Sequence, residues 1–188
     1  MKKFVLLLAA VFFFTVSASE EAVKKTVIFY RQAIARLDGL TALTVCAPEY
    51  VEINNNSTID YEKTRQVAVS LQNMVKSEDL EEIFGIYKQI IGQSITSEEL
   101  VKIRAMKGTP EEKKNVEQIK KYFKILIDVS SNIVKNMRIE GIKIDGDRAV
   151  ARQVIVHPES NQNLYTDYQL VKRTGKWLIT KVIEGGVQ

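Results

Sequence analysis

The last fifty residues constrain the fold most strongly, because they read as four successive β-strands with short connections. Two tight turns, Asp145-Gly146-Asp147 and Arg173-Thr174-Gly175-Lys176, join the outer pairs of strands, and a seven-residue loop, His157 to Asn163, joins the middle pair. Asp-Gly between β-rich segments indicates a hairpin, because both residues tolerate positive φ. The sequence therefore predicts an antiparallel meander with strands at 138–145, 148–156, 164–173 and 176–184.

Such a meander has one face to bury, and the segments before it must cover that face. Apolar residues at the helical period predict five helices: 20–38, 61–76, 79–91, 96–108 and 109–137. We expect Ser19 to cap the first helix and Gly39 to end it in the left-handed conformation. Thr96 and Thr109 are expected to open capping boxes. A brief strand is expected at Tyr50 to Ile53.

The apolar phase of the first C-terminal strand changes at Gly141, since Ile139 is in one phase and Ile142 and Ile144 are in the other. A glycine where the pattern slips predicts a β-bulge, which bends the sheet. A bent sheet on helices encloses a hollow. Periodicity alone leaves open which sheet face lines that hollow.

The first eighteen residues have the pattern of a secretory signal peptide. Lys2 and Lys3 precede the apolar run Phe4 to Val16, and Ser17-Ala18 follows it as a cleavage site. The run is shorter than the ~20 residues of a spanning helix, and no later stretch is apolar enough to span a bilayer. We therefore expect export to the periplasm or the extracellular space, and one mature domain at 19–188.

Composition excludes several classes of function. Removal of Lys2 and Lys3 lowers the formal net charge from +4 to +2, and the remaining charge is mixed, so we expect no nucleic-acid partner. Cys46 and His157 are the only residues of their types, which excludes an intramolecular disulfide and a thiolate metal cluster. We expect neither a metal nor a cofactor.

Two stretches, Ile142 to Ala151 and Tyr165 to Ile179, resemble the nuclear transport factor two-like superfamily, also called ketosteroid-isomerase-like or cystatin-like cones. The resemblance implies an α+β fold in which a bent antiparallel sheet wraps on N-terminal helices as a cone-shaped barrel with an open end. Its members include isomerases, dehydratases, polyketide cyclases and non-catalytic binding proteins. The chain departs from a minimal cone in its extra helices at 79–108, which suit a lid or an assembly surface.

Five residues are candidates for a site in the cone. Asp167 lies mid-strand, and it is a plausible general base if it faces the cavity. The interpretation that we favour is that it faces solvent or pairs with Arg152 or Lys172. Arg152 lies among valines, and it either anchors an anionic ligand or forms an outward ion pair. His157 is expected at the solvated rim of the cone.

Tyrosine hydroxyls supply the remaining candidates. Tyr30 lies on the buried stripe of the first helix. Either its hydroxyl reaches the cavity, or its ring packs in the core while the hydroxyl contacts water. Tyr168 is the last candidate, and it shares a strand face with Leu164, Thr166 and Leu170, opposite Asp167.

Three functions remain open. The first is an exported domain that binds a small apolar or anionic ligand in the cone, without a catalytic set. The second is a cofactor-independent isomerase, dehydratase or cyclase that uses Asp167 or His157 on a small apolar molecule. The third is an interaction domain that forms a homodimer through the outer face of the sheet.

Overall fold

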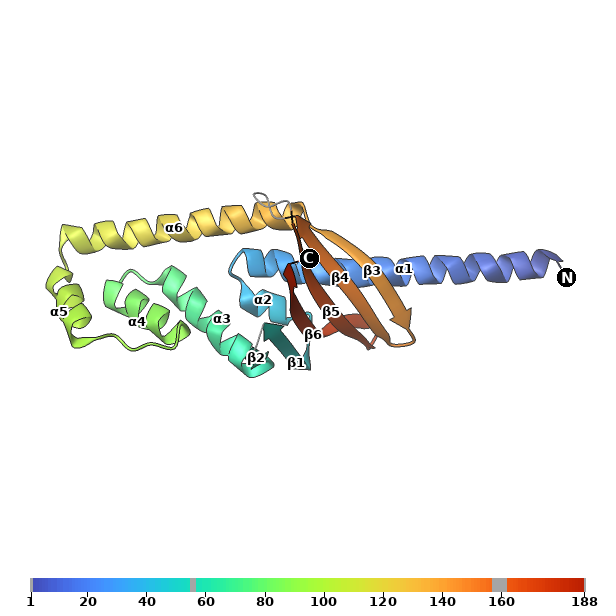
Figure 1. Cartoon of the computed structure of the whole chain (residues 1–188), viewed down its shortest axis with the longest axis horizontal. Helices are drawn as coiled ribbons and strands as arrows, with labels where there is room; N and C mark the ends of the chain where they lie inside the picture. Colours follow the sequence, from blue (N-terminus) through green and yellow to red (C-terminus); the bar gives the residue numbers. More distant parts are fainter. Residues whose placement is uncertain (1, 55–56, 157–161, 188) are drawn as a thin grey trace.

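The computed structural model describes residues 2–54, 57–156 and 162–187, and over these the chain forms six helices and one open, six-stranded sheet (Figure 1). The strands are β1 (Cys46–Asn54), β2 (Ser57–Asp60), β3 (Arg138–Asp145), β4 (Arg148–Val156), β5 (Asn163–Arg173) and β6 (Lys176–Val187). The helices are α1 (Lys2–Ala35), α2 (Gly39–Leu43), α3 (Tyr61–Lys76), α4 (Leu80–Ile90), α5 (Ser97–Met106) and α6 (Pro110–Lys135). The predicted α+β fold class is confirmed. None of the described helices combines the length and the apolar character that crossing a membrane requires.

The strand order is β2-β1-β6-β5-β4-β3, and the four C-terminal strands form the predicted antiparallel meander. The prediction was incomplete at the other edge, where only a brief strand was expected. There β1 pairs parallel with β6, and β2 pairs antiparallel with β1. A parallel pairing across more than 120 residues leaves no local pattern, so it could not be predicted from neighbouring residues.

The predicted bulge in β3 is confirmed. Gly141 has φ of 61°, and the register between β3 and β4 shifts between Glu140 and Lys143. The concave face is now identified as well, because Ala149, Ala151 and Gln153 of β4 are buried.

Helix α1 lies against the concave face and contacts β3, β4 and β6. Its predicted stripe is buried as expected, with Val23 and Val27 fully inaccessible and Tyr30 nearly so. Side chains from α1, α2, β1 and the meander form one hydrophobic core here. A second, smaller core lies between the later helices, around Met74, Ile83 and Ile103.

Both predicted ends of the first helix differ in the structure. Ser19 lies within α1, which begins at Lys2, so it is not a cap in this chain. At the other end the left-handed residue is Leu37, with φ of 58°, and not Gly39. Gly39 instead starts α2, whose N-cap is Asp38. Its missing side chain is used for a close approach, because α3 packs directly against it at Ala68.

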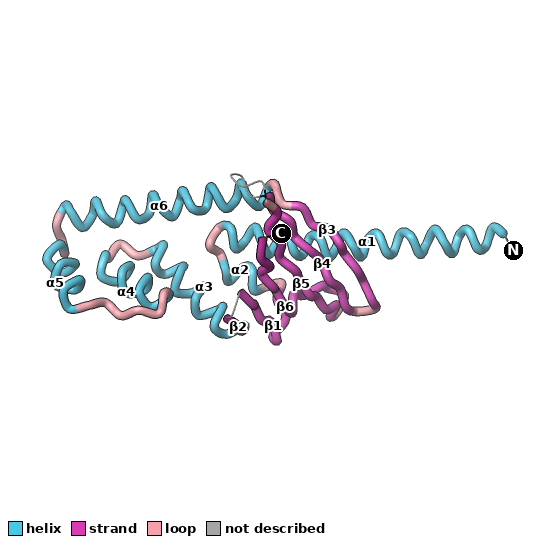
Figure 2. The backbone as a smooth tube through the Cα atoms, in the orientation of Figure 1, coloured by secondary structure: helices cyan, strands magenta, loops and turns pink. Residues whose placement is uncertain are grey.

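Helices α3 to α6 form an arm that extends away from the sheet, and α6 returns along it to β3 (Figure 2). The predicted capping box of Thr96 and Glu99 is present. The box at Thr109 is only half formed: its side chain accepts a hydrogen bond from Glu112 N, but the Glu112 carboxylate binds the backbone N–H groups of Gly108 and Leu80. The α5–α6 turn is thereby tied to the start of α4.

Replacement of Gly39 tests the close approach of α2 to α3. A Cβ atom at this position would lie 2.7 Å from the Cβ of Ala68, so we expect Gly39→Ala to lower the free energy of unfolding by about 1–3 kcal/mol. The matched control is Gly85→Ala inside α4, where the nearest atom is Ile95 Cδ1 at 3.7 Å; we expect a gain of roughly 0.5–1 kcal/mol. Urea unfolding followed by circular dichroism measures both. Equal effects of the two substitutions would contradict the packing described.

Candidate functional site

A cluster of buried and half-buried polar side chains lies between α1 and the end of the concave face. We call it the inner cluster. Its members are Tyr30, Arg31, Tyr50, Glu52, Gln153, Tyr168 and Glu184. Strand alternation brings them together, because Glu52 is paired with Val182 in the parallel β1–β6 ladder and Glu184 lies two residues further along β6.

A chain of hydroxyl groups runs through the inner cluster. The hydroxyl oxygens of Tyr30 and Tyr50 are 2.7 Å apart, and the Tyr50 hydroxyl donates to Glu52 Oε2 at 2.9 Å. Because a carboxylate only accepts and Tyr50 has one proton, Tyr30 is the donor to Tyr50. Burial is the main cause that raises the pKa of Tyr30 and of Tyr50, so both hydroxyls keep their protons.

The second tyrosine contact in the cluster joins neighbouring strands. The Tyr168 hydroxyl donates to Gln153 Oε1 at 2.7 Å, and both residues are almost completely buried. The ring of Tyr168 meets the ring of Tyr30 edge-on, with centroids 6.2 Å apart. Aromatic rings therefore occupy the centre of the cone.

Arg31 supplies the positive charge of the inner cluster. Burial raises the pKa of Tyr168 and of Glu184, whereas the neighbouring Arg31 guanidinium lowers both. The Nε atom of Arg31 is buried, and within the described part of the chain it has no hydrogen-bond partner. A guanidinium does not lose its proton in proteins, so this cation is permanent.

Glu184 is the titratable group of the cluster. Burial, followed by repulsion from Glu52, raises the pKa of its carboxyl above the usual range for glutamate, against the attraction of Arg31. The Glu184 carboxyl therefore keeps its proton to a higher pH than an exposed glutamate does.

Two of the sequence candidates lie on the opposite face of the sheet. Arg152 Nε donates to Asp167 Oδ1 at 2.7 Å and Arg152 Nη2 to Oδ2 at 2.9 Å, with both side chains nearly half exposed. The favoured interpretation, an ion pair between them, is confirmed. The other interpretation, a base and an anion anchor inside the cone, was wrong, because strand alternation turns these side chains away from Gln153 and Tyr168.

The remaining candidates have different outcomes. Tyr30 and Tyr168 lie in the inner cluster, where they are bonded to protein groups. His157 lies outside the described residues. Cys46 is buried, as expected for a small apolar side chain, and burial raises the pKa of its thiol to about 12. No group of three metal-ligating side chains was found in the described ranges.

Helix α1 packs on the concave face of the sheet, and a well-formed apolar groove lies in the helical arm. The groove has a volume of about 580 Å³. Its lining comes from α3, α4, α5 and α6: Met74, Leu80, Ile83, Phe84, Tyr87, Ile103, Met106, Asn115, Gln118, Ile119, Tyr122, Phe123 and Leu126.

The groove contains no acidic or basic side chain among its described lining residues. Its polar groups are two carboxamides, Asn115 and Gln118, and two tyrosine hydroxyls. Asn115 Nδ2 donates to the sulfur of Met106 at 3.3 Å. Tyr87 and Tyr122 are 47% and 70% exposed, so aromatic surface stands open at the groove. The groove thus offers a large apolar contact area with a few neutral hydrogen-bonding groups.

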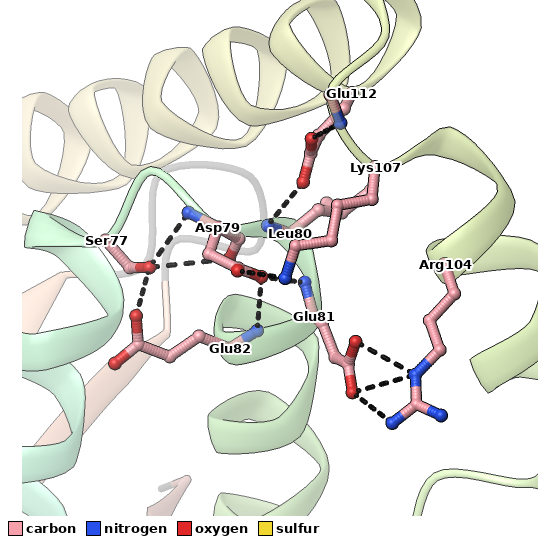
Figure 3. A network of polar contacts seen from close by, with 9 residues as sticks. Ser77, Asp79, Leu80, Glu81, Glu82, Arg104, Lys107 and Glu112 are labelled. Carbon is pink, nitrogen blue, oxygen red and sulfur yellow. Dashed lines mark hydrogen bonds and ion pairs between the residues drawn. The ribbon is translucent and has the colours of Figure 1, made fainter.

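A network of polar contacts holds the start of α4 to the α5–α6 turn (Figure 3). Asp79 caps α4 by accepting hydrogen bonds from Glu81 N at 2.8 Å and from Glu82 N at 3.2 Å. Lys107 Nζ lies 3.0 Å from the other Asp79 oxygen. The hydrogen bond from Lys107 is the main cause that lowers the pKa of Asp79. The cap therefore remains charged well below neutral pH.

Two further contacts complete this network. Arg104 of α5 forms a bidentate ion pair with Glu81 of α4, with Nη2 and Oε1 2.9 Å apart (Figure 3). The Ser77 hydroxyl donates to Glu82 Oε2 at 2.5 Å. These contacts fix α4 and α5 relative to each other, and both helices line the groove.

These two sites were only partly predictable from the sequence. The strong apolar stripes at 79–91 and along α6 were visible, but their convergence on one groove depends on the packing of four helices. Glu52 and Glu184 were missed because a charged residue near a strand end is usually solvated. Arg31 was hidden next to a buried tyrosine in an amphipathic helix.

The chain matches no protein-family model and no curated protein sequence. Solved structures that it resembles include a nuclear transport factor two-like protein of unknown function from Silicibacter pomeroyi, with 9% identity, a TM-score of 0.42 and coverage of 92% of this chain and 98% of that one. Another protein of the same description is from Shewanella baltica, with 12% identity, a TM-score of 0.41 and coverage of 90% of this chain and 94% of that one. A proposed ketosteroid isomerase from Shewanella frigidimarina also matches, with 12% identity, a TM-score of 0.40 and coverage of 87% of this chain and 94% of that one.

The likeness to the nuclear transport factor two-like superfamily that was predicted from the sequence is thus found among solved structures as well. At identities of 9–12% it concerns the fold alone. Neither a substrate nor a reaction is transferred to this chain from these proteins.

The raised pKa of Glu184 predicts how stability depends on pH. The folded state binds a proton at Glu184 more tightly than the unfolded state does. The contribution of Glu184 to the free energy of unfolding therefore falls as pH rises from the ordinary glutamate pKa through the raised pKa of the folded state. We expect Glu184→Gln to be more stable than the wild type at pH 7 and to lose this part of the pH dependence. Thermal unfolding from pH 4 to pH 8 measures the effect. A Glu184→Gln variant that is less stable than the wild type at pH 7 would contradict the raised pKa.

Proposed function

We propose that this protein binds a small, uncharged, apolar molecule in the groove between α3, α4, α5 and α6. The observation that carries the proposal is the groove itself, which is open, apolar and held by the polar network at Asp79. Ligand sites of proteins typically have volumes of about 300–1,000 Å³, apolar linings and a few placed polar groups. The groove has each of these properties.

The chemistry of the lining selects the class of ligand. Without an acidic or basic group in its lining, the groove leaves a buried charge of the ligand uncompensated, which is costly. Asn115 and Gln118 can bind one neutral polar group such as a hydroxyl or a carbonyl. Met74 and Met106 suit ligands of varied shape, because methionine is flexible and makes favourable contacts with aromatic rings. An apolar molecule with one neutral polar group fits this lining.

Substitution of an exposed lining residue outside α6 tests the groove. We expect Tyr87→Asp to weaken binding of the uncharged fluorescent probe N-phenyl-1-naphthylamine by roughly tenfold or more, because it removes aromatic contact and introduces a charge. Val101→Asp is the matched control: Val101 is 68% exposed on α5 and does not line the groove, so its affinity is expected to stay at the wild-type value. Fluorescence titration measures both. Equal affinities of Tyr87→Asp and the wild type would refute the site.

The inner cluster favours a second candidate function, cofactor-independent acid–base catalysis of the isomerase, dehydratase or cyclase type. Glu184 has a raised pKa and lies near Arg31 and Tyr168, which supports proton exchange at its carboxyl oxygen. This function ranks second because the tyrosine rings occupy the cone, whereas the groove is open.

We further propose that the protein acts outside the cytoplasm, with residues 1–18 removed as a signal peptide. The basic start, the apolar run and the small residues at the end of this segment support the proposal. Intact-mass measurement of protein from the exported fraction of the native host is expected to give a chain that starts near Ser19. Recovery of the full-length chain from the cytosolic fraction alone would contradict export.

A further inference from the structure

One polar side chain that lines the apolar groove, Asn115 of α6, has hydrogen-bonding capacity that the protein itself does not use. The side chain is partly buried, and over the described residues its carboxamide makes one hydrogen bond, from Nδ2 to the sulfur of Met106 at 3.3 Å. A thioether sulfur is only a weak acceptor, and no described residue donates a hydrogen bond to Asn115 Oδ1. The carboxamide oxygen is therefore left to whatever occupies the groove.

The contact with Met106 also determines how the carboxamide is turned. A methionine sulfur accepts a hydrogen bond but has no proton to donate, so only the amino end of Asn115 can bond to it. The nitrogen thus faces Met106, and the oxygen faces away from that sulfur. What the groove offers at this place is an acceptor with both lone pairs free of described donors.

The backbone at Asn115 is held in place by the contacts of the α5–α6 turn. Glu112, three residues earlier on α6, accepts hydrogen bonds from Gly108 N at 2.6 Å and from Leu80 N at 3.4 Å. The next residue, Val116, is 2% exposed and belongs to the small core between the helices. The carboxamide is therefore positioned before a ligand arrives, which reduces the entropy lost on binding.

The stability of α6 gives no reason for an asparagine at this position. Asparagine is among the weaker helix formers, whereas leucine, which has a similar size, is among the better ones. The positions of α6 that continue the groove lining toward the sheet include Ile119, Phe123 and Leu126, which are all apolar. A carboxamide beside them is unfavourable for packing and suited to recognition of a polar group.

We propose that Asn115 selects ligands that carry a hydroxyl group, whose proton is donated to Asn115 Oδ1. This inference rests on the binding of an apolar molecule in the groove, and it assigns the neutral polar group of that molecule to a hydroxyl rather than a carbonyl. A ligand without a donor displaces water from Oδ1 and leaves this oxygen unpaired, which costs more than one hydrogen bond gains. The ligand class is therefore that of apolar alcohols and phenols.

A matched pair of ligands tests this selection: 2-naphthol and its methyl ether, 2-methoxynaphthalene. Only the naphthol has a proton to donate, and titration followed by naphthalene fluorescence gives both affinities. We expect the ratio of the naphthol affinity to the ether affinity to fall about three- to tenfold in Asn115→Leu, as loss of one neutral hydrogen bond predicts. The ratio removes the contribution of the extra methyl group, which is the same in both proteins.

Gln118→Leu is the matched control. It removes a carboxamide from the same helix, but Gln118 is exposed, so water satisfies it and the ratio is expected to equal that of the wild type. The ether is expected to bind Asn115→Leu at least as tightly as the wild type, which verifies that the variant keeps its groove. An unchanged ratio in Asn115→Leu, or an equal fall in Gln118→Leu, would overturn the selection by Asn115.

A measurement on the wild type makes the test independent of how the variants fold. The side-chain ¹⁵N signal of Asn115 is expected to shift more with 2-naphthol than with the ether, because only the naphthol donates to the carboxamide oxygen. Equal shifts would contradict the proposal. Both ligands are expected to bind Tyr87→Asp more weakly than the wild type. If both bind the wild type and lose affinity in Tyr87→Asp without any effect of Asn115, groove binding stands and the selection fails; if neither binds, both fail.

Discussion

The packing of α1 into the concave face of the sheet is the contact on which the remaining structure depends. Tyr30 brings its ring between those of Tyr50 and Tyr168, and its hydroxyl ends in the chain that leads to Glu52. This contact gives the buried hydroxyl groups of Tyr30 and Tyr50 their hydrogen-bond partners. It also places three tyrosine rings in the centre of the cone.

The helical arm contains the apolar groove, which is lined by residues of α3, α4, α5 and α6. The small core between these helices buries Met74, Ile83 and Ile103, whereas Tyr87 and Tyr122 remain exposed. The network around Asp79 and Lys107 holds the arm in this arrangement without filling it. The sheet and α1 thus form the main core, and the groove lies in the helices inserted before the meander.

The sequence predicted those features that depend on neighbouring residues. The meander, the bulge at Gly141 and the Thr96 box follow from local patterns, and the structure has all of them. Features that depend on distant contacts were not predictable. Gly39 was assigned to a helix end because its contact with Ala68 in α3 is invisible in the sequence. In the same way, Asp167 could not be placed on a sheet face until the partners of β5 were known.

Methyl NMR spectroscopy tests most directly whether the helical groove, and not the cone, is the binding site. Isoleucine and methionine methyl groups are labelled with ¹³C, and N-phenyl-1-naphthylamine is added to the protein. We expect the signals of Ile103 and Met106 in the groove to shift, and that of Ile179, fully buried in the cone, to stay unchanged. Shifts confined to Ile179 and its neighbours would show that the ligand enters the cone and would contradict a binding site in the helical arm.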